Sequence, residues 1–120
     1  MSLTVMIVDD SLFMRKILRG IFEGKGCTVI AEAASGLEAM KNLHASRPDI
    51  ICLDIVLPDS NGLTLLEEMI AVCPSSKIVV CSSLGQQMTI QHALDLGARA
   101  FIQKPFTPEG VADVLQKLEE

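Results

Sequence analysis

The short segment Asp49–Asp54 limits what this chain can fold into more than any other feature. It places four apolar residues, Ile50-Ile51-Cys52-Leu53, between two aspartates, and Pro48 precedes it. A run this short and apolar at every position is typical of a strand that is covered on both faces of a parallel sheet. Asp54 then lies where a central strand ends, and a carboxylate there is costly unless other groups pair with it.

The hydrophobic pattern on either side of this segment predicts an alternation of strands and helices. The second strand is expected to be short and nearer an edge of the sheet. Apolar runs predict strands over Leu3–Val8, Cys27–Ala31, Asp49–Asp54, Ile78–Cys81 and Ala100–Ile102. Between and after them, apolar residues recur every three or four positions, which is the period of a helix with one buried face.

Capping residues predict where the helices begin. Ser11, Ser35 and Thr107 each precede a helical period, and their side chains can accept a hydrogen bond from a free backbone amide. Asn61-Gly62 marks the start of the third helix. The second helix is expected to run from Ser35 to Arg47-Pro48, with Leu37, Met40 and Leu43 on its apolar side, and the fourth over about Gln86–Leu96 with Gly97 at its end.

Five strands joined by helices of this length predict an α/β fold with a parallel five-stranded sheet and right-handed crossovers. Helices on both faces give a three-layer (βα)5 sandwich. The chain has 120 residues, which fits one domain over residues 1–120.

Polar residues close four of the five predicted strands. They are Asp9 and Asp10 after the first, Asp54 after the third, Ser82 after the fourth and Lys104 after the fifth. Because parallel strands all end at the same edge of a sheet, these side chains are expected to meet there.

The chemistry of such a cluster points to a metal and a phosphate. At about 4 Å and an effective dielectric constant near 20, two carboxylates repel by on the order of 4 kcal/mol. Mg²⁺ relieves this repulsion, since it prefers oxygen ligands and is often shared between carboxylates and a phosphate. An aspartate left free can act as a nucleophile and form an aspartyl phosphate. Lys104 and Ser82 supply a cation and a hydroxyl for the phosphate oxygens.

The composition excludes several other classes. The net charge of −5 argues against direct binding of nucleic acid, which needs clustered Lys and Arg. No apolar run approaches the roughly 20 residues of a membrane span. The four cysteines form no CxxC pair and are expected to be reduced thiols of a cytoplasmic protein.

These residues make the chain resemble the receiver domains of two-component response regulators over residues 4–118. The matching motifs are Val8-Asp9-Asp10-Ser11, Asp54 with Pro58 and Gly62, Ser82, and Lys104-Pro105-Phe106. The resemblance implies a flavodoxin-like fold with strand order 2-1-3-4-5. Chemotaxis-type single-domain regulators are the most similar, but the chain could equally be the receiver half of a longer regulator with a transcription-factor or methylesterase output.

The resemblance also implies a role for each site residue. Asp54 would accept a phosphoryl group from a histidine kinase or phosphotransfer protein. Asp9, Asp10, Asp54 and the backbone carbonyl of Val56 would bind Mg²⁺. Ser82 and Phe101 would be switch residues, which change position when Asp54 is phosphorylated, and Lys104 would sense the phosphate. The peptide bond from Lys104 to Pro105 would be cis, and Gly62 would have a structural role.

As a receiver, the protein would be a phosphoacceptor switch rather than an enzyme, limited to its own phosphorylation and dephosphorylation. It would change the affinity of the face formed by the fourth helix, the fifth strand and the fifth helix for a downstream target. It would be a monomer or a weak phosphorylation-dependent dimer.

Three other functions remain open from the sequence. A phosphatase would need a second acid two residues after Asp54, where Val56 stands. A flavodoxin-like cofactor binder would need a Ser/Thr/Gly-rich loop where Asp9 and Asp10 stand. A phosphorylation-independent interaction module would not need the complete site.

Two smaller expectations concern apolar residues near the site. Leu12 and Phe13 come shortly after the acidic pair, and we expect at least one of them to be exposed. Their role is either docking of a partner protein or simple packing in the core. The resemblance implies that Val56 and Leu84 would flank the phosphoryl group. Both are apolar, so we expect slow self-dephosphorylation, because neither could hold an attacking water.

Overall fold

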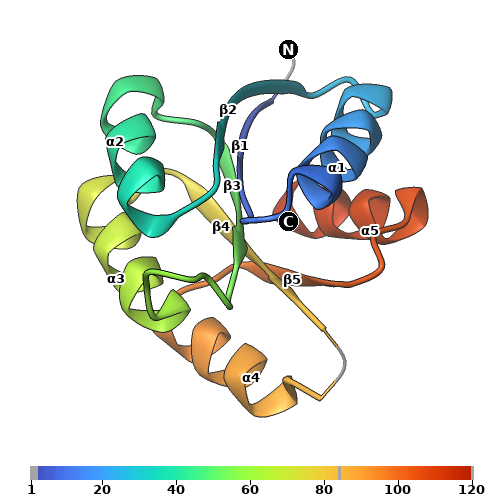
Figure 1. The fold of residues 1–120 in the computed structure, drawn as a ribbon. Helices are drawn as coiled ribbons and strands as arrows, with labels where there is room; N and C mark the ends of the chain where they lie inside the picture. The colour runs from blue at the N-terminus through green and yellow to red at the C-terminus, as the bar shows by residue number, and fades with distance from the viewer. Residues whose placement is uncertain (1–2, 84, 120) are drawn as a thin grey trace.

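The computed structural model describes residues 3–83 and 85–119, in which five strands alternate with five helices (Figure 1). The strands are β1 (Thr4–Val8), β2 (Thr28–Ala33), β3 (Ile50–Asp54), β4 (Lys77–Ser82) and β5 (Ala100–Gln103). The helices are α1 (Leu12–Gly24), α2 (Gly36–Ser46), α3 (Gly62–Val72), α4 (Gln87–Leu96) and α5 (Pro108–Glu119). The expectation of one domain over 1–120 extends to Met1, Ser2, Leu84 and Glu120, which lie outside the described residues.

The strands form one parallel sheet in the order β2-β1-β3-β4-β5, as the resemblance implied. β3 is central, and all five of its residues are buried. β2 is an edge strand, as expected, but it is not short. Its six residues equal those of β4, because Glu32 and Ala33 continue the pairing with Ile7 and Val8. The predicted strand ends at Ala31 because the polar Glu32 interrupts the apolar run. In the structure, Arg15 and Arg19 bind the Glu32 carboxylate.

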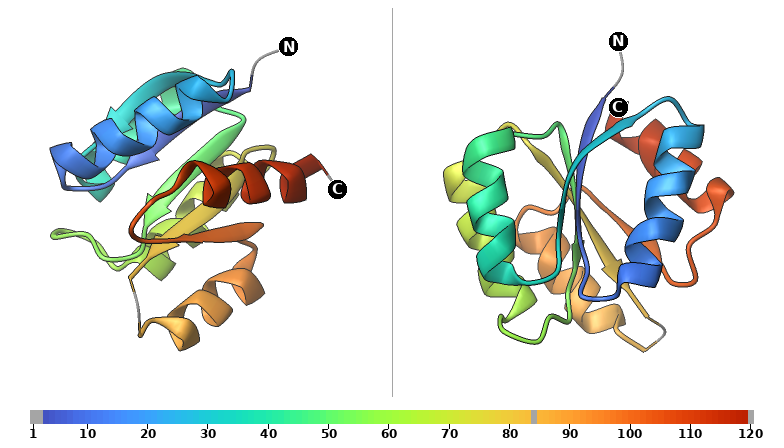
Figure 2. Two further views of the ribbon diagram at one scale, coloured as in Figure 1. Left: turned by 90° about the vertical axis from the view of Figure 1, so that its right-hand side faces the viewer. Right: turned by 45° about the horizontal axis from the view of Figure 1, so that its top comes forward.

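The sheet separates two hydrophobic clusters, since successive residues of each strand point to opposite faces. Met6 and Val8 of β1 pack with α2, α3 and α4, whereas Val5 and Ile7 pack with α1 and α5. Figure 2 shows α2 and α3 on one side of the strands and α1 and α5 on the other. This confirms the three-layer sandwich.

The three predicted caps begin α1, α2 and α5, and Asn61, predicted as the start of α3, caps that helix as well. Ser11 Oγ accepts a hydrogen bond from Met14 N at 3.2 Å, and Ser35 Oγ accepts one from Glu38 N at the same distance. Asn61 Oδ1 caps α3, and Thr107 Oγ1 accepts a hydrogen bond from Gly110 N at 3.0 Å.

One prediction about α2 is wrong, because Leu37 is 68% exposed. The buried residues of this helix are Gly36, Ala39 and Leu43, while Met40 packs partly buried at the edge of the cluster. Leu37 stands two residues before Ala39, which is about 200° around a helix, so it points away from the sheet.

Gly62 fixes how the chain passes from β3 to α3. A Cβ atom at this position would lie 2.1 Å from the carbonyl oxygen of Ile55. Only glycine lets the start of α3 lie directly against the end of β3. The expected structural role of Gly62 therefore has a steric cause in the fold.

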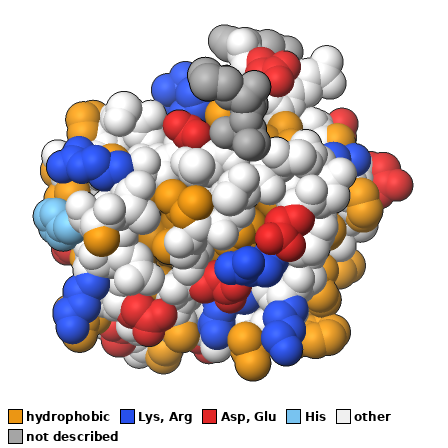
Figure 3. All heavy atoms as spheres, turned by 90° about the horizontal axis from the view of Figure 1, so that it is seen from above, with side chains coloured by type: hydrophobic (Ala, Val, Ile, Leu, Met, Phe, Trp, Pro, Cys, Tyr) orange, Lys and Arg blue, Asp and Glu red, His pale blue; other side chains and the backbone are white. Residues whose placement is uncertain are grey.

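The cysteines, the helix lengths and the charged surface bear on the expectations drawn from composition. The four cysteines are free and buried. Within the described residues, no helix is both long and apolar enough to cross a membrane. Figure 3 looks onto the end of the sheet where the strands begin, and acidic and basic side chains are interspersed there.

Candidate functional site

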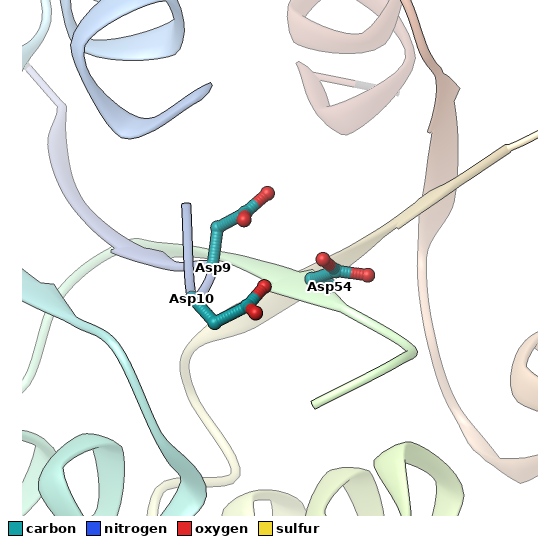
Figure 4. A group of neighbouring side chains, drawn as sticks. All are labelled: Asp9, Asp10 and Asp54. Carbon is teal, nitrogen blue, oxygen red and sulfur yellow. The ribbon is translucent and has the colours of Figure 1, made fainter. Parts of the chain in front are cut away.

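Three carboxylates meet where β1 and β3 end. One carboxylate oxygen from each of Asp9, Asp10 and Asp54 lies within 4.8 Å of the others. Figure 4 shows the pair from the end of β1 beside Asp54 from the end of β3. Asp9 and Asp54 are buried, whereas Asp10 is exposed. The expected convergence at the carboxyl edge of the sheet is thus present.

Lys104 brings a positive charge to this cluster. Its Nζ lies 3.0 Å from Asp54 Oδ2 and 3.1 Å from Asp9 Oδ2. The backbone holds the residue in place, because Lys104 N donates to the carbonyl oxygen of Ser82 at 2.7 Å. The bond from Lys104 to Pro105 is cis, as expected.

Backbone amides orient the two buried carboxylates. Ser11 N donates to Asp9 Oδ1 at 2.9 Å, and Val56 N donates to Asp54 Oδ1 at 3.0 Å. Each carboxylate therefore has one oxygen fixed by the chain that follows it. The other oxygen, Oδ2, faces Lys104 in both cases.

The protonation of the site follows from burial and charge. Burial raises the pKa of Asp54 above its usual value and the charge of Asp9 adds to this, outweighing the Val56 amide and the Lys104 ammonium, which act to lower it. Burial alone would lower the pKa of Lys104, but the carboxylates of Asp54 and Asp9 raise it. At Asp54 burial thus outweighs the nearby cation and disfavours the charged form, whereas at Lys104 two opposite charges outweigh burial and favour the charged form.

Two buried polar atoms at the site accept or donate no hydrogen bond among the described residues. They are Asp9 Oδ2 and Ser82 Oγ. The contact of Asp9 Oδ2 with Lys104 is an ion pair that lacks hydrogen-bond geometry. Leaving such atoms unsatisfied costs about 1–3 kcal/mol each. An oxygen-rich cluster with an unsatisfied carboxylate oxygen fits a hard divalent cation.

A hollow lies over Asp54, and two residues of the loop between β4 and α4 help to line it. They are Ser83 and Gln86, which join Asp10, Val56, Pro58 and Lys104 around it. Ser83 N donates to Gln86 Oε1 at 2.7 Å. Gln86 was predicted only as the start of a helix, and no local signal shows that the loop before α4 turns its side chain toward the site.

Arg15 is a second residue that the sequence reasoning missed as part of the site. Its Nη1 donates to the carbonyl oxygen of Asp9 at 2.6 Å, and its Nε pairs with Glu32 at 3.0 Å. Burial acts to raise the pKa of Glu32, but Arg19 and Arg15 outweigh it and lower this pKa. Arg15 therefore fixes the backbone of Asp9 from a position one helical turn after Ser11.

The predicted switch residue Phe101 lies outside the carboxylate cluster. It is on β5, 41% exposed, and lines two hollows, one with Ile90 and Leu94 of α4 and one with Val114 of α5. Ser82, in contrast, is 1% exposed. The two residues thus occupy a buried and an outward position on neighbouring strands.

Apolar side chains are exposed beside the site. Leu12 is 55% exposed, Phe13 68% and Val56 61%, so the expectation that at least one of Leu12 and Phe13 is exposed is confirmed. Leu84, the other residue of the dephosphorylation prediction, lies outside the described residues.

Comparisons with known proteins agree with this geometry. Residues 5–116 match the family described as response regulator receiver domain. The chain is 40% identical to a chemotaxis protein CheY of Thermotoga maritima over 120 residues, which is 100% of both chains. It superimposes on a putative response regulator from Chloroflexus aurantiacus with a TM-score of 0.89, 28% identity and full coverage of both chains.

A multidomain neighbour is also similar. NtrX from Brucella abortus matches with a TM-score of 0.91 and 29% identity, over 99% of this chain and 27% of that one. The same fold therefore occurs in single-domain proteins and as part of longer regulators. From its motifs, its strand order and these similarities, the chain belongs to the receiver domain family of two-component response regulators.

Proposed function

We propose that Asp54 accepts a phosphoryl group from a protein phosphohistidine and that the domain signals by the resulting change of charge. The observation that carries this proposal is the meeting of Asp9, Asp10 and Asp54, with Lys104 paired to Asp9 and Asp54. A cluster of this kind has little structural purpose, since it concentrates repulsive charge at a buried point. Its donor set is suited to a cation and a phosphoryl group.

The carboxylates of Asp9, Asp10 and Asp54 would hold Mg²⁺, with the Val56 carbonyl as a further oxygen donor. The bound ion would neutralise negative charge on the transferring phosphoryl group. Asp9 Oδ2 supports this assignment, because its contact with Lys104 lacks hydrogen-bond geometry and this buried oxygen is suited to bind a cation.

In the transfer step, a carboxylate oxygen of Asp54 forms a bond to phosphorus. The bond between phosphorus and the donor's imidazole nitrogen breaks, and that nitrogen leaves with the electron pair. Val56 N–H donates to one oxygen of Asp54 and Lys104 contacts the other, so both groups orient the attacking carboxylate. Lys104 provides a cation for an oxygen of the transferred group.

Ser82 and Lys104 would then be drawn to the phosphoryl oxygens. The Ser82 hydroxyl is buried and has no hydrogen-bond partner among the described residues, so a new acceptor nearby gives it the bond that it lacks. Movement of the loop after β4 would open the space beside α4 into which Phe101 can turn. The face formed by α4, β5 and α5 would in this way change its affinity for a target protein or output domain.

The exposed pair Leu12 and Phe13 would dock the phosphodonor protein. Both lie in the first turn of α1, directly after Asp9 and Asp10, and both expose more than half of their surface. A donor must approach Asp54 from this edge of the sheet. Apolar contact area beside the carboxylates would hold its histidine in reach.

Incubation with acetyl phosphate and Mg²⁺ tests the proposal. We expect wild-type protein to gain one acid-stable, base-labile phosphoryl group by mass spectrometry. Asp54→Asn should gain none, while Asp113→Asn, an exposed substitution on α5, should behave as wild type. Equal phosphorylation of Asp54→Asn would refute the assignment of the acceptor.

A further inference from the structure

We propose that Asp59 is a positioning residue of the acceptor site, which holds the loop after β3 so that the Val56 amide points at Asp54. This inference rests on the proposed function, because it concerns the same carboxylate. Asp59 lies outside the cluster formed by Asp9, Asp10, Asp54 and Lys104.

The first observation is a pair of hydrogen bonds between distant segments. Gly36 N donates to Asp59 Oδ1 at 2.9 Å, and Leu37 N donates to Asp59 Oδ2 at 3.3 Å. The Asp59 carboxylate thus clamps the first turn of α2 from a loop more than 20 residues further along the chain. These amides, that of Gly36 first, lower the pKa of Asp59 below its usual value.

The second observation is steric. A Cβ atom on Gly36 would lie 2.1 Å from Ser60 Oγ, so the loop rests directly on the beginning of α2. Glycine at this position permits the close approach that the Asp59 hydrogen bonds require. The side-chain bonds and the shape of the helix start therefore fix the loop together.

The third observation links this contact to the acceptor. Val56 pairs with Asn61 across the loop, and Val56 N donates to Asp54 Oδ1 at 3.0 Å. Apart from this bond to β3, the bonds of Asp59 are the side-chain hydrogen bonds among the described residues that tie residues 56–60 to another helix or strand. Without them, the placement of Val56 would depend mainly on the two ends of the loop.

The consequence concerns both the free and the metal-bound site. Loss of the clamp should let the loop move, so that the Val56 N–H bond to Asp54 weakens and the Val56 carbonyl is less well placed as a metal donor. Residues that orient metal ligands from outside the ligand set typically change metal affinity by about 10–100-fold. Because Asp59 acts through the loop and contacts no metal-binding side chain, we expect a loss of about tenfold, at the lower end of that range.

The experiment compares two variants that each remove a cap from the same helix. Asp59→Ala removes the clamp, and Ser35→Ala removes the Ser35 Oγ bond to Glu38 N without touching the loop. Amide NMR spectra of metal-free protein report the Val56 signal directly, and titration with MgCl₂ gives the dissociation constant. Asp59→Asn serves as a conservative variant, since it keeps an acceptor oxygen for Gly36 N–H.

We expect Asp59→Ala to shift the Val56 amide signal upfield and to weaken Mg²⁺ binding about tenfold, with Asp59→Asn intermediate and Ser35→Ala unchanged. Similar effects of Asp59→Ala and Ser35→Ala would overturn the inference, because both would then reflect a weaker α2. An unchanged Val56 signal in Asp59→Ala would also overturn it. If wild-type protein binds Mg²⁺ but takes no phosphate, the proposed function fails while the role of Asp59 in placing Val56 stands.

Discussion

The Lys104 ammonium lies 3.0 Å from Asp54 Oδ2, although 50 residues separate the two in the sequence. The carboxylate that we propose as the phosphoryl acceptor is therefore paired with a cation in the protein without metal or phosphate. Lys104 shares its charge with Asp9 at 3.1 Å. It thus holds together a cluster that would otherwise repel.

Removal of this cation should destabilise the metal-free protein. Lys104→Met keeps the apolar stem but leaves Asp54 and Asp9 without their common partner, and we expect a loss of about 1–3 kcal/mol in the free energy of unfolding. Because Mg²⁺ would replace the lost charge, it should restore more stability to this variant than to wild type.

Urea denaturation in EDTA and in MgCl₂ measures both effects, with the exposed Lys16→Met as the control. Equal stability of Lys104→Met and wild type in EDTA would show that the cluster does not need the cation.

The contact between Gly62 and Ile55 predicts a strong effect of adding one methyl group. Gly62→Ala would bring its Cβ to 2.1 Å from the Ile55 carbonyl oxygen, so we expect a loss of at least about 1–3 kcal/mol in stability. A Cβ atom on Gly20 of α1 would meet no heavy atom of another element within 4 Å, and Gly20→Ala should stabilise the protein by about 0.5–1 kcal/mol.

Chemical denaturation of these two variants is the measurement. A gain or no change for Gly62→Ala would contradict the close approach of β3 and α3.

Glu32 predicts a pH dependence of stability. Arg19 and Arg15 lower its pKa from the usual 4.5 in the folded state, so in acid this carboxylate binds fewer protons when folded than when unfolded. Its contribution is present above pH 4.5 and is lost as pH falls through the lowered folded-state value. We expect Glu32→Gln to cost about 1 kcal/mol at pH 7, a modest value because the Arg19 side chain is 38% exposed.

Unfolding of wild type and Glu32→Gln measured from about pH 7 to about pH 3 should show the two curves converging in acid. A difference that stays constant over this range would mean that the ion pairs do not stabilise the fold.

The apolar residues Val56 and Leu84 predict a long-lived phosphoryl group. Val56 is exposed over the hollow at Asp54 and offers no side-chain hydrogen bond to an attacking water. Replacing both residues by Asn or Gln should speed decay of the phosphorylated protein about fivefold to tenfold, as expected for one added hydrogen bond of about 1 kcal/mol.

Loss of label after removal of the phosphodonor gives the decay rate, and Leu37→Gln on the exposed side of α2 is a matched control. Decay that is unchanged in the double variant would point to another residue lining the hollow, such as Gln86.

The sequence alone determined the alternation of strands and helices, three of the helix caps and the edge at which Asp9, Asp10, Asp54 and Lys104 meet. These features follow from local periodicity, from short-range hydrogen bonds and from the rule that parallel strands end on the same side. The order of the strands came from the family resemblance. No local pattern specifies it.

Tertiary structure decided everything that depends on long-range approach. β2 continues past Glu32, because two arginines from α1 neutralise that carboxylate. Tertiary structure turned Leu37 to the outside of α2 and brought Asp59 onto the start of that helix. It also placed Gln86 and Arg15 at the site. Contacts between residues 6 to 50 positions apart depend on how the helices pack on the sheet, and a single sequence does not encode that packing in any local period.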